Sequence, residues 1–226
     1  MTDADTTTAT TATSTPTDLP GEAADSTGVP DEREVFCLAD DALTAVVATI
    51  REEQWALPVP PTLTRRGADR EVALREVIGY HAYDDAWVPD MLAGRRMAEL
   101  GDDPYTGDLL GERPVQAFTA IADRAKAAAR GLDDLDRVVH CSFGDFPARE
   151  YLWQVNMFRG SRAVDIARFL GVDDTLPERL AAGLLAELTP NAEEWRAMGL
   201  FGPAVHVGPN ATPQQRLLGL IGRDPG

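Results

Sequence analysis

Apolar residues recur at three- and four-residue spacings along most of the chain, which is the periodicity of amphipathic helices. This pattern predicts main helices over about 32–53, 68–100, 114–131, 147–170 and 177–188. A helical turn near 193–198 and a short helix over 213–221 follow, whereas residues 137–144 are predicted to be extended. Pro89 is expected to kink the second helix. The sequence therefore predicts an all-α fold, a four-helix bundle with short extra C-terminal helices.

The first 30 residues differ in composition from the rest of the chain. They are rich in Thr, Ala, Asp and Pro and contain almost no large apolar side chains. Such a segment cannot bury enough surface to offset the entropy lost on ordering. We therefore expect residues 1–30 to be a disordered acidic leader, and residues 31–226 to form one helical domain.

The overall charge narrows the partners that can be expected. The 226 residues carry a net charge of −16, and the pI is about 4.5. Binding to nucleic acid or to an anionic membrane needs a clustered basic face, so neither partner is expected. No apolar run reaches the roughly 20 residues that span a bilayer. Two cysteines and a leader without an apolar core indicate a cytoplasmic protein.

Polar residues interrupt the apolar stripes of two predicted helices. In the helix over 68–100, His81 and one of Asp84 and Asp85 fall on the apolar line. In the helix over 147–170, Arg159 and Arg162 occupy the middle of the stripe. If these two helices face each other, the polar residues that interrupt their apolar stripes meet inside the bundle.

Three explanations of these buried charges remain open, because an unpaired buried charge costs several kcal/mol. One is a structural network in which Arg159 or Arg162 pairs with Asp84, Asp85 or Asp165. A second is a pocket in which the two guanidinium groups bind an anion. The third is a metal site that uses His81, although one histidine is too few ligands and arginines repel a cation.

A few further side chains are candidates for chemistry. Tyr83 and Trp87 lie close to His81 on the same predicted helix and are expected to form the wall of a ligand pocket. Tyr151 is a weaker candidate for this role. His140 and Cys141 are neighbours in an extended segment, so they point to opposite sides and do not form a catalytic dyad. We expect them to be a structural pair.

Three segments of the chain resemble a known superfamily. They are LREVIGYHAYDDAWVPDMLAG, EYLWQVNMFRGSRAVDIARFLGVD and FGPAVHVGPNATPQQRLLGLIGRDP. They are similar to DinB-like proteins, within the actinobacterial branch near mycothiol-dependent maleylpyruvate isomerases. The resemblance covers about residues 33–225, and its most specific part is the C-terminal phrase FGP…RLLGLIGRDP.

The resemblance implies a helix bundle that holds a divalent metal, zinc or nickel, and uses mycothiol as a thiol cofactor. It places the first metal ligand at His81. The other two ligands would fall at Phe158 or Arg159 and at Arg162, and none of these side chains binds a metal. We therefore expect His81 to be a remnant ligand and the protein to need neither metal nor cofactor.

Two functional hypotheses follow. The first is an isomerase or thiol S-transferase acting on a small anionic molecule. Its catalytic residues would be His81, Asp84 and Asp85, and its substrate-binding residues would be Arg159, Arg162, Tyr83, Trp87 and Asp165. The second is a non-catalytic ligand-binding or stress-related protein with a structural Arg/Asp network. Bundles of this kind often pair, so a homodimer is one expected assembly.

Overall fold

The structure is a computed structural model that describes residues 28–64, 70–101, 103–142 and 144–226. It is mostly helical, with one small two-stranded sheet in these ranges, in agreement with the predicted all-α class. The predicted leader falls largely on residues 1–27, which lie outside the described residues. The helices and strands are, in chain order, α1 (Glu32–Val47), α2 (Leu74–Leu92), α3 (Pro114–Arg130), β1 (Val138–Cys141), β2 (Gly144–Pro147), α4 (Ala148–Leu170), α5 (Glu178–Leu188), α6 (Ala192–Ala197) and α7 (Pro213–Leu220).

The helix boundaries follow from local signals in the sequence. Asp31 caps α1 by accepting hydrogen bonds from the backbone N–H groups of residues 33 and 34. Pro114 occupies the first turn of α3, where a missing N–H costs nothing. Gly171 ends α4 in the left-handed conformation, with a φ of 68°. These ends agree with the predicted ones to within one or two residues.

Two predicted helices are too long. The helix predicted over 32–53 ends at Val47, and a separate 3₁₀ turn over Glu52–Gln54 follows it. The helix predicted over 68–100 begins at Leu74 and ends at Leu92, while residues 68 and 69 lie outside the described ranges. Pro89 lies inside α2, and the chain leaves the helix at Gly94, which has a φ of 73°. Apolar spacing continues past both ends, so periodicity alone overestimates these lengths.

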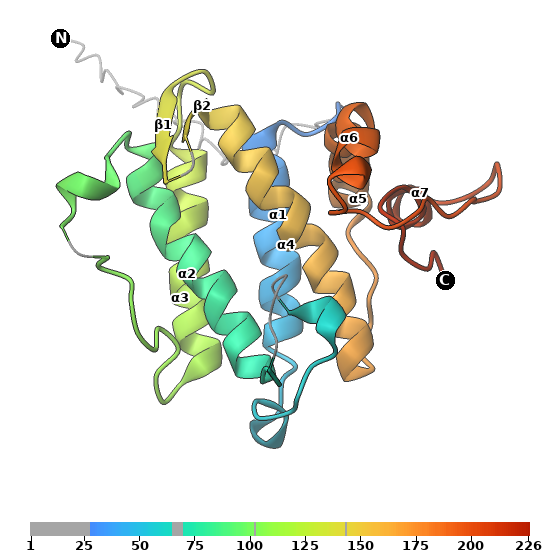
Figure 1. The fold of residues 1–226 in the computed structure, drawn as a ribbon, viewed down its shortest axis with the longest axis horizontal. Coiled ribbons are helices and arrows are strands. Elements are labelled where there is room, and N and C mark those ends of the chain that lie inside the picture. Colours follow the sequence, from blue (N-terminus) through green and yellow to red (C-terminus); the bar gives the residue numbers. More distant parts are fainter. Residues whose placement is uncertain (1–27, 65–69, 102, 143) are drawn as a thin grey trace, which may run out of the picture.

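The long helices pack side by side, as Figure 1 shows. α1 packs against α4 and α3, α2 packs against α3, and α5 packs against α1 and α4. α2 and α4 approach each other less closely. The β1–β2 hairpin lies at one end of the long helices, and its register pairs Val139 with Phe146. β2 continues directly into α4, so the hairpin is positioned above the space between α2 and α4.

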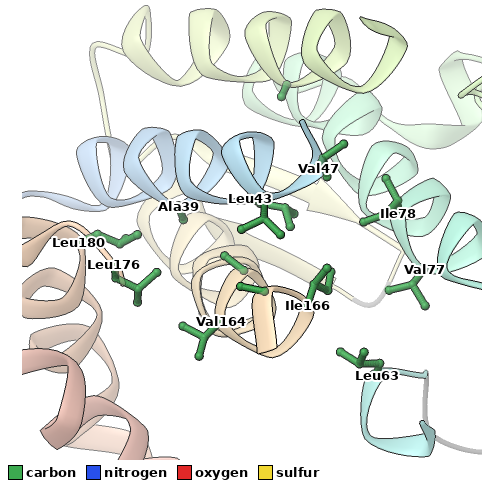
Figure 2. Close-up of a cluster of buried hydrophobic side chains, with 14 of the residues drawn as sticks. Ala39, Leu43, Val47, Leu63, Val77, Ile78, Val164, Ile166, Leu176 and Leu180 are labelled. Atoms are coloured by element: carbon green, nitrogen blue, oxygen red, sulfur yellow. The ribbon is translucent and has the colours of Figure 1, made fainter. Parts of the chain in front are cut away.

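The main hydrophobic core lies where α1 meets its neighbours. Figure 2 shows Leu43 and Val47 of α1 close to Ile78 of α2 and Ile166 of α4. A second buried cluster lies nearer the hairpin and includes Phe36, Trp87 and Leu152. Within the described ranges, no helix is both long and apolar enough to cross a lipid bilayer.

Candidate functional site

Arg159 lies at the centre of the bundle and is the largest fully buried side chain in the described ranges, with an exposed fraction of 1%. Its Nε atom is 2.8 Å from Asp40 Oδ1 on α1, and its Nη2 atom is 2.5 Å from Asp85 Oδ1 on α2. Nη1 donates a hydrogen bond of 3.4 Å to the backbone carbonyl of His81. One side chain of α4 therefore links three helices.

The two carboxylates of this network are also removed from solvent, since Asp40 and Asp85 both have an exposed fraction of 0%. Burial raises the pKa of Asp40 to about 6, against the lowering effect of Arg159. Burial also raises the pKa of Asp85 well above its usual range. The contacts are ion pairs without aligned hydrogen bonds, because no oxygen of either carboxylate accepts a hydrogen bond from the described residues. Two acids thus compete for one guanidinium group.

A cavity of about 240 Å³ lies between α2 and α4, on the other side of Arg159. Aromatic side chains dominate its wall: they are Tyr80, Tyr83, Trp87, Tyr151 and Phe158. Sulfur-containing side chains add to it, namely Met91, Met97 and Cys141. Cys141 and Ser142 bring the end of β1 to the cavity, so the hairpin closes one side of it. The surface of the cavity is mostly apolar, and polar side chains reach it at His81, Asp84, Ser142, Gln154 and Arg159.

His81 lines this cavity and is buried, with an exposed fraction of 4%. Burial lowers the pKa of its imidazole well below the usual range, and the positive charges of Arg159 and Arg162 lower it further. The imidazole is therefore neutral at pH 7. It can accept or donate one hydrogen bond, but it supplies no positive charge to a ligand.

The aromatic wall is held by its own contacts. The Trp87 ring packs edge-on against Tyr105, with ring centroids 5.0 Å apart, and against Tyr83 at 6.3 Å. The Tyr83 hydroxyl donates to Asp103 at 2.6 Å, and the Tyr105 hydroxyl donates to Asp90 at 2.7 Å. These two bonds join α2 to the connection between α2 and α3.

The predicted site residues divide into two groups. The cavity brings together His81, Tyr83, Asp84, Trp87 and Arg159, and it also includes the weaker candidate Tyr151. Asp85 points away from the cavity into the network around Arg159. This pair is the contact that the structural-network explanation anticipated.

Arg162 and Asp165 lie outside the group of residues that line the cavity. The Arg162 Nη1 atom donates to the backbone carbonyl of Thr62 at 2.9 Å and is 3.9 Å from Asp165 Oδ2. Asp165 accepts two hydrogen bonds of 2.8 Å from Arg223, near the C-terminus. The two arginines of the stripe therefore do not form a shared fork for an anion.

Two residues of the buried network and the cavity were not predicted from the sequence. Asp40 completes the buried network from α1, and its position four residues after Phe36 and three before Leu43 places it on the apolar stripe. Cys141 lines the cavity, whereas its neighbour His140 turns to Asp145, with Nδ1 2.8 Å from Oδ1. Burial, with Asp145, raises the pKa of the Cys141 thiol to about 11, so the thiol is protonated at pH 7.

The side chains do not fit the metal site that the resemblance implies. The described residues contain no group of three or more His, Cys, Asp or Glu side chains placed to hold a metal ion. Arg159, one of the positions at which the resemblance places a metal ligand, holds its guanidinium group against the carboxylates of Asp40 and Asp85. A cation there would be repelled by that fixed charge.

Comparison of the chain with protein-family models, curated proteins and solved structures finds no significant match. The interpretation of the site therefore depends on its own geometry.

Proposed function

We propose that the protein binds a small molecule in the cavity between α2 and α4 and that the network of Arg159, Asp40 and Asp85 is structural. The single observation that carries this proposal is an aromatic cavity whose one guanidinium group is already neutralised by two buried carboxylates. Such a cavity can bind an apolar or aromatic ligand. The Arg159 guanidinium group is already paired with two carboxylates, so it is not available to bind an anionic ligand.

The proposal includes the fold family. We infer that α1, α2, α3 and α4 form a DinB-like four-helix bundle, with α5, α6 and α7 as additions. The packing of α1 against α4 and of α2 against α3 supports this view. The two free cysteines in the described residues are consistent with the expected cytoplasmic location.

The binding proposal is tested by NMR with p-cresol as the probe. We expect p-cresol to shift the indole N–H signal of Trp87 and to leave those of Trp153 and Trp195 unchanged, because these two pack on each other outside the cavity. Phe158→Ala should weaken binding, since Phe158 lines the cavity and is 47% exposed. Met198→Ala is the matched control, with an equally exposed side chain away from the cavity. An unchanged Trp87 signal, or equal shifts at all three tryptophans, would contradict the proposal.

A second candidate is the metal-independent isomerase or thiol S-transferase acting on a small anionic molecule. The observation in its favour is that His81 and Asp84 line the same cavity, where they could move a proton. It is tested by incubating the protein with maleylpyruvate and a low-molecular-weight thiol. Turnover that disappears in His81→Gln would support the enzyme, and equal rates with and without the protein would exclude this reaction.

A further inference from the structure

The tyrosines of the protein are concentrated around one cavity. The sequence contains four, and three of them, Tyr80, Tyr83 and Tyr151, line the space between α2 and α4. The fourth, Tyr105, packs edge-on against Trp87 in the same wall. Aromatic faces carry partial negative charge, and several of them around one space attract an organic cation.

Acidic side chains lie at the cavity and behind it. Asp84 lines the cavity, and Asp40 and Asp85 lie directly behind Arg159. Among the lining residues that the structure describes, Arg159 is the one Arg or Lys. Its charge is shared between two carboxylates at 2.8 and 2.5 Å, and its side chain is 1% exposed. Asp84 is therefore the acidic side chain among the described lining residues, and the charge of Arg159 is already shared with two acids.

Two other basic side chains, Arg162 and His81, add no positive charge to the described lining. Arg162 lies outside the lining and donates to the carbonyl of Thr62. His81 lines the cavity, but its buried imidazole is neutral at pH 7. A cation that entered would meet aromatic rings, sulfur atoms and a carboxylate, all of which favour positive charge.

We propose that the cavity takes a small organic ammonium ion, held against Tyr80, Trp87, Tyr151 and Phe158 with Asp84 as its counter-ion. This inference rests on the proposed function, because it names the ligand class of the same cavity. The volume of about 240 Å³ lies below the usual range of about 300–1,000 Å³ for larger ligands. The ligand is therefore a compact ammonium ion with a short substituent.

The test compares a cation with a neutral molecule of the same shape. Choline and 3,3-dimethylbutan-1-ol differ in one atom, nitrogen or carbon, and in the charge that it carries. We expect choline to bind about 3- to 30-fold more tightly, which is the range of desolvated cation–π contacts. The indole N–H signal of Trp87 reports binding of both probes. A choline preference below about threefold, or tighter binding of maleate than of choline, would overturn the inference.

Two variants separate the contributions of charge and of aromatic face. Asp84→Asn should weaken choline binding about 3- to 10-fold and leave the neutral alcohol unchanged, because only the cation loses a Coulomb partner. Phe158→Leu keeps an apolar side chain at this half-exposed position but removes the aromatic ring. It should therefore also weaken choline binding more than binding of the neutral alcohol. Met198→Ala should change neither affinity. If neither Asp84→Asn nor Phe158→Leu lowers the choline preference, the assigned counter-ion and aromatic wall are wrong.

The outcomes distinguish this inference from the proposed function. If p-cresol and the neutral alcohol shift the Trp87 signal and choline does not, the cavity binds small molecules but is not a cation site. If none of the three probes shifts that signal, both proposals fail. If p-cresol shifts the signal, and choline binds more tightly than the neutral alcohol with the expected effect of Asp84→Asn, the ligand class is established.

Discussion

Arg159 illustrates how a residue that the sequence marks as a ligand-binding candidate can be engaged in ion pairs inside the fold. Its guanidinium group is positioned by one acid from α1, one acid from α2 and a backbone carbonyl. A buried ion pair adds little stability compared with apolar residues of the same volume, but the loss of one partner is costly. The network therefore specifies how three helices fit together more than it strengthens their association.

Removal of Arg159 should destabilise the protein strongly. We expect Arg159→Met to lower the free energy of unfolding by about 3–5 kcal/mol, because two carboxylates remain buried without a counter-charge. Arg162→Met, at a more accessible arginine with a 3.9 Å ion pair, should lower it by about 1 kcal/mol or less. Urea denaturation at pH 7 measures both. Adding Asp40→Leu and Asp85→Leu to Arg159→Met should restore most of the loss, and failure to do so would contradict the network explanation.

His81 should make the protein less stable in mild acid. Its pKa in the folded state lies well below the usual 6.5, so below about pH 6.5 the unfolded chain binds a proton that the native state does not. The stability of the wild type relative to His81→Gln should fall by up to about 1.4 kcal/mol per pH unit from pH 6.5 downward. Unfolding curves at pH 7.5, 6 and 5 measure this difference. His206→Gln, at an exposed histidine, is the control, and a parallel pH dependence of His81→Gln and wild type would disprove the assignment.

At the scale of elements, the contact between α4 and α5 contains a second buried acid. Glu187 of α5 accepts long hydrogen bonds from Asn156 Nδ2 of α4, at 3.3 and 3.4 Å. Burial raises the pKa of Glu187 to about 8, and Glu32 and Asp31 add to this effect. The buried Oδ1 atom of Asn156 has no hydrogen-bond partner in the described parts of the chain. The described contact between α4 and α5 therefore lacks a hydrogen-bond donor for Asn156 Oδ1.

Replacing this acid by an amide should stabilise the α4–α5 contact at alkaline pH. The native state holds the Glu187 proton up to about pH 8 and the unfolded chain loses it near 4.5, so wild-type stability falls as the pH rises through this window. Glu187→Gln should be about 1–3 kcal/mol more stable than wild type at pH 9 and about equal to it at pH 4. Thermal denaturation at both pH values tests this. The exposed Glu194→Gln should show no such difference, and an equal gain for Glu187→Gln at both pH values would rule out the proton-linked explanation.

The elements also show what periodicity can and cannot predict. The spans of α3, α4, α5 and α7 follow from proline, glycine and apolar spacing in the sequence, and the structure agrees with them. The β1–β2 hairpin was expected only as an extended segment, because pairing depends on a turn that brings Val139 opposite Phe146. The end of α2 at Leu92 was missed because the apolar spacing continues through Met97 and Leu100.

The partner of Arg159 could not be chosen from the sequence for a similar reason. Asp84 and Asp85 are separated by about 100° around the helix axis, so a small rotation decides which one faces the core. In the structure, Asp85 faces Arg159 and Asp84 lines the cavity. Asp40 was missed although it lies on an apolar stripe, because it is followed by a second acid and resembles part of a solvated face.

At the scale of the whole molecule, close backbone contacts hold the C-terminal segment together. Gly202 and Gly222 approach so closely that a Cβ atom on Gly222 would lie 2.5 Å from the Gly202 carbonyl carbon. Arg196 donates to the backbone carbonyls of Gly202 and Leu220, at 3.0 and 2.6 Å. The two hydrogen bonds from Arg223 to Asp165 then join this segment to α4.

A single methyl group should loosen this C-terminal segment. A Cβ atom at Gly219 would lie 2.6 Å from the Val205 carbonyl oxygen, and backbone cannot move aside as a side chain can. Gly219→Ala should therefore cost about 1–3 kcal/mol of unfolding free energy. It should also speed hydrogen exchange of the Val205 amide, which donates to the Gly219 carbonyl at 2.9 Å. Gly208→Ala, which has open space around it, is the control, and equal exchange in both variants would contradict the close packing.

The three-way contact of Arg159 also has an evolutionary consequence. A lineage that loses Asp40, Asp85 or Arg159 alone inherits an unbalanced charge in its interior, and this is costly at every intermediate step. Related sequences should consequently carry either all three charged residues or apolar residues at all three positions. Mixed sets should be rare. Positions 40, 85 and 159 are thus expected to be inherited as a single character, although they lie on three different helices.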